Sequence, residues 1–212
     1  MAQIKIVSDF VCPFCFLGEK TVEETFQPNE IEWIPFELRP EGSVPLDPNS
    51  AYVQQSMKQS VLPIAERLGI EIRLPDISPI PRTRLAHIGF YYAKEHGKGN
   101  DYFIAVFKAY WQQGRDISQS GVLAQVAEHI GLDTQAFLSA LQDERYAKLH
   151  EEGLRQTDSV RAVPTFFVGD RVLQGIQSKE SLELARDEAA RKVASDPDAS
   201  GAASCSIDGC GC

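Results

Sequence analysis

Two cysteines near the start of the chain, Cys12 and Cys15, are separated only by Pro13 and Phe14. A thiolate is the nucleophile in disulfide exchange, and a free thiol with a pKa of about 8.5 supplies few thiolates at neutral pH. We expect Cys12 to begin a helix, where unpaired N–H groups and the helix dipole favour negative charge. Cys15 then lies one turn further on the same side. The spacing predicts a redox pair in which Cys12, exposed to partners, attacks first and Cys15 resolves the mixed disulfide.

Three further cysteines, Cys205, Cys210 and Cys212, lie together near the end of the chain, and no cysteine lies between the two groups. A disulfide scaffold in a secreted protein would scatter its cysteines through the fold. Two local groups indicate redox chemistry or metal binding instead. A Cys-x-x-Cys motif can also form half of a zinc site, but that site needs a second pair of ligands. A strand–helix context favours the redox interpretation.

Composition excludes several classes of partner. The formal net charge of the 212 residues is −9, so the chain has no general affinity for phosphate backbones, and nucleic acid is not an expected partner. No apolar run approaches the roughly eighteen residues of a membrane helix. The first residues lead directly into a strand pattern without the order of a secretory signal. We therefore expect a cytoplasmic protein without a membrane partner.

The elements around Cys12 and Cys15 follow from residue patterns. Alternation over residues 4–7 predicts a strand that ends at Ser8 and Asp9. A helix begins at Cys12 and Pro13, because proline suits the first helical turn. A second strand is predicted over residues 31–36, where Pro35 indicates an edge strand or a bulge. The chain therefore begins in the order strand, helix, strand.

The middle of the chain has helical patterns and no convincing strand. Thr134 is the expected N-cap of one of these helices. The predicted helices cover residues 51–68, 82–96, 102–113, 121–130, 134–141 and 143–158.

Strand patterns return at residues 163–168 and continue to Leu173, with a hairpin turn at Gly169 and Asp170. The last helix is predicted over residues 178–194, with Ser178 near its N-terminal cap. We expect three parts: an α/β domain from residues 1–48 and 143–195, an all-helical insertion over 49–142, and a C-terminal tail over 196–212. The tail composition cannot bury a core.

Residues 11–18 (Val-Cys-Pro-Phe-Cys-Phe-Leu-Gly) and 160–166 (Val-Arg-Ala-Val-Pro-Thr-Phe) together resemble the DsbA-type branch of the thioredoxin superfamily. Within that branch the chain resembles FrnE-like proteins, which are related to 2-hydroxychromene-2-carboxylate isomerases, over roughly residues 3–193. The resemblance implies an α/β thioredoxin fold, with a central mixed sheet flanked by helices and an all-helical insertion. It also implies a cis peptide before Pro164 and backbone groups of Val163 that face an extended substrate beside Cys12.

The chain departs from this family pattern at two positions. Phe14 replaces the histidine of DsbA and cannot donate a hydrogen bond to the Cys12 thiolate. We therefore expect a weaker oxidant, with a reduction potential between about −180 and −230 mV. Ile6 stands where thioredoxins and DsbA have a buried acid, so another group must relay the proton. Asp9 and Glu37 are the candidates. Separately, the four histidines lie on predicted helices and are read as surface or packing residues, except that His87 lies on an insertion helix that would overhang the site.

The predicted function is thiol–disulfide oxidoreductase or isomerase, an enzyme acting on protein or glutathione disulfides through Cys12 and Cys15. No resident cofactor is expected, and glutathione is the candidate co-substrate. A glutathione-dependent isomerase of a small aromatic or polyketide substrate is the alternative. The related isomerases carry serine in place of the first cysteine, whereas both cysteines are present here.

The tail cysteines leave three interpretations open. Cys205 and Cys210 match the Cys-x4-Cys pair of some FrnE-like proteins and would be a second redox pair that exchanges with Cys12 and Cys15. The roughly ten residues before Cys205 can span about 30 Å when extended. Alternatively, Cys205, Cys210 and Cys212 bind zinc or cadmium, as in a metal-binding stress protein. The third interpretation is a dispensable tail.

Overall fold

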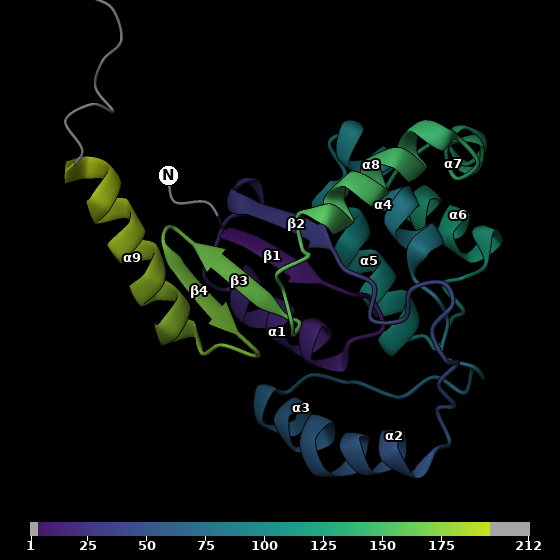
Figure 1. Cartoon of the computed structure of the whole chain (residues 1–212), viewed down its shortest axis with the longest axis horizontal. Coiled ribbons are helices and arrows are strands. Elements are labelled where there is room, and N and C mark those ends of the chain that lie inside the picture. The colour runs from purple at the N-terminus through teal and green to yellow at the C-terminus, as the bar shows by residue number, and fades with distance from the viewer. Residues whose placement is uncertain (1–3, 196–212) are drawn as a thin grey trace, which may run out of the picture.

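The computed structural model describes residues 4–195, which form a four-stranded sheet and the helices around it (Figure 1). The strand order is β2-β1-β3-β4. β1 runs parallel to β2 and antiparallel to β3, and β3 and β4 form the predicted hairpin. The sheet is therefore mixed, as predicted, and Pro35 lies on an edge strand. The strands are β1 (Ile4–Ser8), β2 (Ile31–Pro35), β3 (Thr165–Val168) and β4 (Arg171–Gln174).

Helix α1 (Pro13–Glu23) begins where the sequence predicts, with Cys12 as its N-cap residue and Pro13 at its first position. Cys12 has extended backbone dihedral angles, and its carbonyl accepts hydrogen bonds from the N–H groups of Cys15 and Phe16. The Cys12 side chain makes no capping bond. The thiol therefore stands at the helix N-terminus and is free for other contacts.

The predicted helices are all present, with small shifts in their bounds. They are α2 (Ala51–Ser56), a π-helical turn η2 (Met57–Val61), α3 (Leu62–Leu68), α4 (Arg84–Glu95), α5 (Gly99–Trp111), α6 (Ser120–His129), α7 (Thr134–Ala140), α8 (Glu144–Arg155) and α9 (Lys179–Ser195). A short 3-10 turn, η1 (Pro28–Glu30), precedes β2.

Two details of the helix predictions are wrong. Helix α5 begins at Gly99, three residues earlier than predicted, because the chain turns directly out of α4 at Gly97, which has a φ of 71°. Asp133, not Thr134, caps α7, since its Oδ1 accepts a hydrogen bond from Ala136 N at 2.7 Å. A carboxylate at this position also interacts favourably with the helix dipole.

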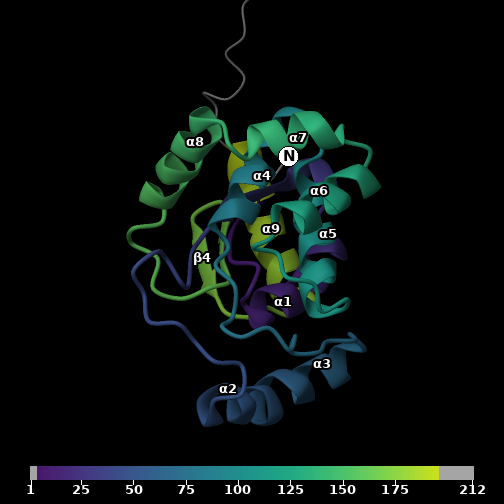
Figure 2. The same ribbon diagram turned by 90° about the vertical axis from the view of Figure 1, so that its right-hand side faces the viewer.

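The helices divide into groups around the sheet. Figure 1 shows α9 on the β4 side and α4 to α8 on the β2 side. Both views place α2 and α3 together at the foot of the molecule, near the start of α1 (Figure 2). Within residues 4–195, no helix is long and apolar enough to cross a membrane.

Aromatic side chains join α5 to the sheet and to the loop before Cys12. The Trp33 ring on β2 stacks on the Phe103 ring of α5 at 4.3 Å between centroids. The Phe10 ring lies 4.4 Å from the Phe103 ring. Trp111 Nε1 donates a hydrogen bond to the Phe10 carbonyl at 2.9 Å. Because all these side chains are buried, α5 forms the packed support under the loop that leads into Cys12.

A buried polar network fixes the segment after β2. The Phe36 carbonyl lies 3.1 Å from His87 Nε2, and Glu37 Oε1 lies 2.5 Å from His150 Nε2. Leu38 N donates a hydrogen bond to Asp9 Oδ2 at 2.6 Å. Three consecutive residues are thus held by polar side chains from α4, from α8 and from the end of β1.

The protonation states of the pair formed by Glu37 and His150 follow from their surroundings. Desolvation raises the pKa of Glu37, but the hydrogen bond from His150 and nearby positive charge outweigh it, so that pKa lies below its usual range. Burial lowers the pKa of His150, although Glu37 opposes this. A neutral His150 imidazole that donates from Nε2 to an ionised Glu37 carboxylate accounts for the lowered pKa of both groups.

We expect the free energy of unfolding of His150→Gln to fall less than that of the wild type as the pH is lowered from 7.5 to 5.5. The folded-state pKa of His150 lies below the unfolded value of about 6.5, so its contribution is present above that pH and is lost as the unfolded chain gains a proton. Glutamine keeps a donor for Glu37 without titrating. Urea unfolding at several pH values should show a cost of about 1–2 kcal/mol at pH 7.5 that narrows toward pH 5.5.

The matched control is His129→Gln, because His129 is exposed on α6. This variant should follow the wild-type pH profile. If the free energy of unfolding of His150→Gln depended on pH as steeply as that of the wild type, the assignment of a neutral buried imidazole would be wrong.

Candidate active site

The structure brings Cys12 next to Val163, although 150 residues separate them in the sequence. Cys12 Sγ lies 3.5 Å from the Val163 carbonyl oxygen and donates to it. The peptide bond between Val163 and Pro164 is cis, as the resemblance implied. Thr165 Oγ1 donates to the Ala162 carbonyl at 2.6 Å, which holds this turn at the start of β3. The Cys-Pro-Phe-Cys segment and the Val-Pro-Thr segment therefore meet at one point.

The prediction that Cys12 is exposed to partners is wrong. Only 4% of Cys12 is accessible, and only 2% of Cys15. The reason is tertiary: Val163 and the insertion residues cover the helix start, so Cys12 is reached only through a pocket. Within the described residues both cysteines are free thiols.

Cys15 holds its proton tightly. Burial raises the pKa of the Cys15 thiol well above its usual range, and the hydrogen bond and charge of Cys12 raise it further. The backbone of Asp9 and the hydroxyl of Ser8 act in the opposite direction. A covalent modification of the Cys12 sulfur would remove the hydrogen bond and the charge by which Cys12 raises the Cys15 pKa, and Cys15 would then be easier to deprotonate.

Ser8 is a residue of this site that sequence reasoning missed. It is fully buried at the end of β1, and its Oγ has no hydrogen-bond partner among residues 4–195. A serine at a strand end is also an ordinary turn residue, so nothing in the sequence singled it out. In the fold it can donate to the Cys15 sulfur as negative charge develops there.

A pocket of about 330 Å³ opens beside Cys12. Pro13, Phe14 and Val163, which the sequence placed near the reactive thiol, all line it. Val11 and Ala162, the neighbours of Cys12 and Val163, also line it. Its other walls come from the insertion and from the segment after β2, and they are mostly apolar: Leu38, Arg39, Leu46, Tyr52, Val53, Ser56, Met57, Leu74, Ile80 and Trp111. We call this the Cys12 pocket.

The candidate proton relays lie behind this pocket. Asp9 is buried, its carbonyl accepts a hydrogen bond from Cys12 N at 3.1 Å, and its carboxylate binds Leu38 N. Glu37 is engaged with His150. The sequence suggested that His87 would overhang the site, and this prediction is wrong. His87 is buried and stacks on Phe10 at 4.5 Å between centroids. Of these groups, Asp9 is the one whose backbone contacts the cysteine pair.

Glu19 is a second buried acid on α1 that sequence reasoning did not single out. Burial and the neighbouring Glu23 together raise its pKa to about 8, although Lys108 on α5 opposes this rise. Its Oε1 has no hydrogen-bond partner within the described part of the chain. Glu19 does not line the Cys12 pocket, so we assign it no step at the thiols.

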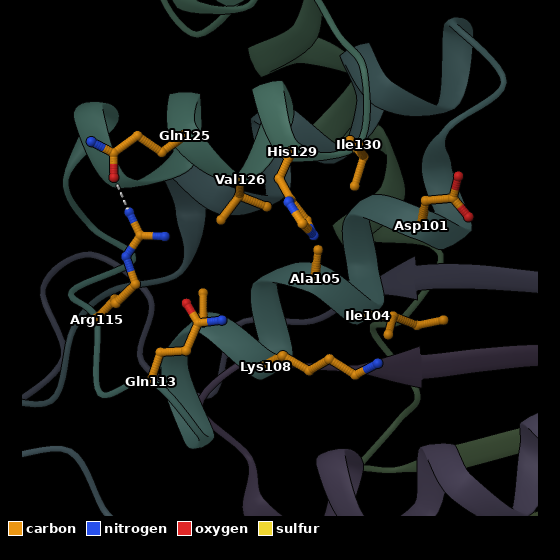
Figure 3. Close-up of a pocket in the computed structure, with 11 residues that line it drawn as sticks. Asp101, Ile104, Ala105, Lys108, Gln113, Arg115, Gln125, Val126, His129 and Ile130 are labelled. Atoms are coloured by element: carbon orange, nitrogen blue, oxygen red, sulfur yellow. Dashed lines mark hydrogen bonds between the residues drawn. The ribbon is translucent and has the colours of Figure 1, made fainter.

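A larger cavity, of about 470 Å³, lies between α5 and α6 (Figure 3). Figure 3 shows His129 of α6 and Lys108 of α5 at this cavity, with Arg115 hydrogen-bonded to Gln125. Neither Cys12 nor Cys15 lines it. Its size alone does not make it a site for thiol chemistry.

The predictions for Cys205, Cys210 and Cys212 lie outside the described residues. Among residues 4–195, no group of three or more His, Cys, Asp or Glu side chains could hold a metal ion.

Comparison with known proteins places this geometry in context. The chain is 42% identical over 196 residues to YwbO of Bacillus subtilis (strain 168), a protein described as uncharacterized, and the match covers 90% of this chain and 98% of YwbO. It is 25% identical over 197 residues to a 2-hydroxychromene-2-carboxylate isomerase of Pseudomonas putida, covering 88% of this chain and 95% of the isomerase.

Solved structures share the fold. A probable DsbA oxidoreductase from Streptomyces coelicolor has a TM-score of 0.73 at 22% identity, with 91% of each chain covered. The cytosolic disulfide reductase DsbM from Pseudomonas aeruginosa, solved with GSH, has a TM-score of 0.60 at 15% identity, with 91% of this chain and 98% of DsbM covered. Residues 3–186 match the DSBA-like thioredoxin domain, and the chain therefore belongs to the DsbA-like thioredoxin family.

Proposed function

We propose that this chain is a thiol–disulfide oxidoreductase that acts on protein disulfides through Cys12 and Cys15. The observation that carries the proposal is the position of Cys12 Sγ, at the wall of an apolar pocket, 3.5 Å from the Val163 carbonyl and next to a buried second thiol. Val163 N–H donates to no backbone carbonyl within residues 4–195. A substrate strand can therefore pair with Val163 on both its polar groups.

The exchange proceeds in two steps. The Cys12 thiolate attacks one sulfur of the substrate disulfide; the substrate S–S bond breaks, a Cys12–substrate S–S bond forms, and the first substrate thiolate leaves and takes a proton. Cys15 then gives up its proton and attacks the Cys12 sulfur. The Cys12–Cys15 bond forms and the second substrate thiol leaves. Two electrons pass from the protein to the substrate, and the reverse sequence oxidises a dithiol.

The surroundings support different roles for the two thiols. The buried Cys15 keeps its proton until Cys12 has formed the mixed disulfide, because burial and the neighbouring Cys12 raise the Cys15 pKa. The apolar walls of the Cys12 pocket shield the mixed disulfide from water and slow the attack of thiols other than Cys15 on it. Glutathione, the ligand in the DsbM structure, is our proposed co-substrate for reducing the Cys12–Cys15 disulfide. A cytoplasmic location is part of the same proposal.

A second candidate function is the glutathione-dependent isomerisation of a small aromatic compound. The Pseudomonas putida relative carries the name of such an isomerase, and an apolar pocket of about 330 Å³ is the right size for an aromatic ligand. Isomerisation would not need Cys15. A Cys15→Ser variant with full isomerase turnover and no disulfide exchange would favour this candidate.

We expect Cys12→Ser to lose catalysed insulin reduction, leaving only the rate of the added thiol. Cys15→Ser should accumulate a mixed disulfide with the substrate, because the resolving thiol is missing. The turbidity assay measures the first effect, and mass spectrometry of the quenched Cys15→Ser reaction measures the second. Circular dichroism checks that both variants are folded. Persistent reduction by Cys12→Ser would refute the redox assignment.

The Cys12–Cys15 potential should lie between about −180 and −230 mV, because Phe14 offers the thiolate no hydrogen bond. Phe14→His should move it to a less negative value, while Phe14→Leu, the matched control, should stay near wild type. Equilibration in glutathione buffers followed by thiol alkylation gives the potential. A wild-type value near −120 mV is incompatible with this expectation.

The tail cysteines extend the proposal, with Cys205 and Cys210 as a second pair that exchanges with Cys12 and Cys15. The double variant Cys205→Ser, Cys210→Ser should slow turnover several-fold, and Cys212→Ser serves as the control for turnover, since it lies outside the proposed redox pair. Zinc and cadmium uptake by the same proteins tests metal binding. Unchanged turnover and unchanged metal uptake in the double variant would mean that the tail is dispensable for both.

A further inference from the structure

A second hollow adjoins the Cys12 pocket. Its volume is about 350 Å³, and Arg39, Leu46 and Ile80 line both hollows. The second hollow continues to Val44, Pro79, Arg82 and Asp116, among other residues. Because the two hollows share these three wall residues, we treat them as one groove that begins at Cys12, passes Arg39 and ends between residues 43–46 and 77–82. The second hollow adds about 350 Å³ to the Cys12 pocket, which is more space than a single aromatic molecule needs.

The walls of the groove suit a polypeptide. Tyr52 is 72% exposed and Val44 is 79% exposed, so large apolar side chains face solvent in both halves. Leu38 is also exposed beside the Cys12 pocket. Exposed apolar side chains along a concave surface mark a binding surface rather than ordinary solvent contact.

Three charged side chains line the groove, and two of them are used by the protein itself. The Arg82 guanidinium donates to the carbonyls of Arg39, Pro40 and Ser43 and to the Ser43 hydroxyl. Both Asp116 carboxylate oxygens accept hydrogen bonds from nearby residues.

The third charged side chain, Arg39, makes no hydrogen bond or ion pair through its guanidinium with the described residues. It also lies at the junction of the two hollows. The groove thus offers one unpaired positive charge to a ligand.

The backbone that carries Arg39 is held rigidly. The preceding residues are fixed by His87, His150 and Asp9 through the buried network, and the Arg39 carbonyl accepts from Arg82 at 3.0 Å. A guanidinium on a fixed backbone loses less freedom on binding a carboxylate than one on a mobile loop.

We propose that Arg39 selects substrates, binding an acidic side chain of an extended peptide whose half-cystine lies at Cys12. This inference rests on the proposed disulfide exchange and adds the substrate class: extended, apolar polypeptide segments with Glu or Asp a few residues from the cysteine. The guanidinium forms a charge-assisted bond with that carboxylate, and the apolar walls take the neighbouring side chains.

The test uses self-quenched homodimers of a ten-residue peptide, joined by one disulfide, in which Glu or Gln is placed at successive distances from the cysteine. Reduction relieves the quenching. For wild type, the best Glu position should raise kcat/KM about fivefold over its Gln partner, mainly through KM, since an exposed ion pair contributes modestly. Added salt should reduce this ratio.

Arg39→Gln should bring the Glu-to-Gln ratio of kcat/KM close to one, and Arg39→Glu should favour a Lys peptide instead. Arg155→Gln is the matched control, because Arg155 is an exposed arginine on α8 outside the groove. Val44→Ser tests the far half of the groove: it should weaken binding of the long peptide more than binding of a four-residue peptide.

The outcomes separate the two levels of the proposal. If no peptide is reduced in a Cys12-dependent manner, the proposed function fails. If all peptides are reduced at equal rates, or if Arg39→Gln keeps the wild-type ratio, only the role of Arg39 fails. If glutathione disulfide and the four-residue peptide depend on Arg39 and Val44 as strongly as the long peptide does, the ligand is a small molecule and the extended-peptide assignment is overturned.

Discussion

The Asp9 carboxylate holds together the two loops that surround the reactive thiol. Asp9 ends the turn out of β1, and its carbonyl accepts the Cys12 N–H, while its carboxylate accepts the Leu38 N–H at 2.6 Å. Burying a polar group away from water is costly unless hydrogen bonds compensate for the lost solvation. Oδ2 has such a bond from Leu38 N, whereas Oδ1 has no hydrogen-bond partner within residues 4–195 and lies 3.5 Å from His87 Nε2. The two loops and α4 are therefore packed around this one buried group.

This requirement explains why the helical insertion is built into the site rather than added beside it. His87 comes from α4 of the insertion and His150 from α8, the helix that follows the insertion, and both reach the segment after β2. Their rings stack at 5.4 Å between centroids, so the two helices meet at the same place. The insertion thereby helps to fix the segment that forms one wall of the Cys12 pocket, and its helix α2 supplies another wall through Tyr52, Val53 and Ser56.

The same scaffold accommodates more than one chemistry in its family, since one relative carries the name of an isomerase and one structural neighbour is a disulfide reductase. What differs is the content of the site. Here two thiols lie in surroundings that separate their roles: Cys12 at a helix start beside a pocket, and Cys15 buried behind it with its pKa raised. Burial of the second thiol costs its charged form solvation, and that cost favours the protonated state of Cys15.

The sequence by itself determined the order of elements, the mixed sheet, the helix start at Cys12 and the juxtaposition with Val163 and Pro164. These features depend on local signals, namely strand alternation, proline at a helix start and glycine at turns, and on the family resemblance. Local signals also gave most helix bounds, with errors where a tight turn or a neighbouring acid decided the cap, as at Gly97 and Asp133.

Only the tertiary structure decided how far Cys12 is covered, which polar groups are buried together and which charge is left unpaired. The pairing of Glu37 with His150 joins residues 113 positions apart, and Arg39 is notable only because Arg82 and Asp116 beside it are already bonded. Ser8, Glu19 and Arg39 are common residue types in ordinary sequence surroundings. Their chemical character comes from desolvation and from distant partners, and both are properties of the packed fold rather than of the local chain.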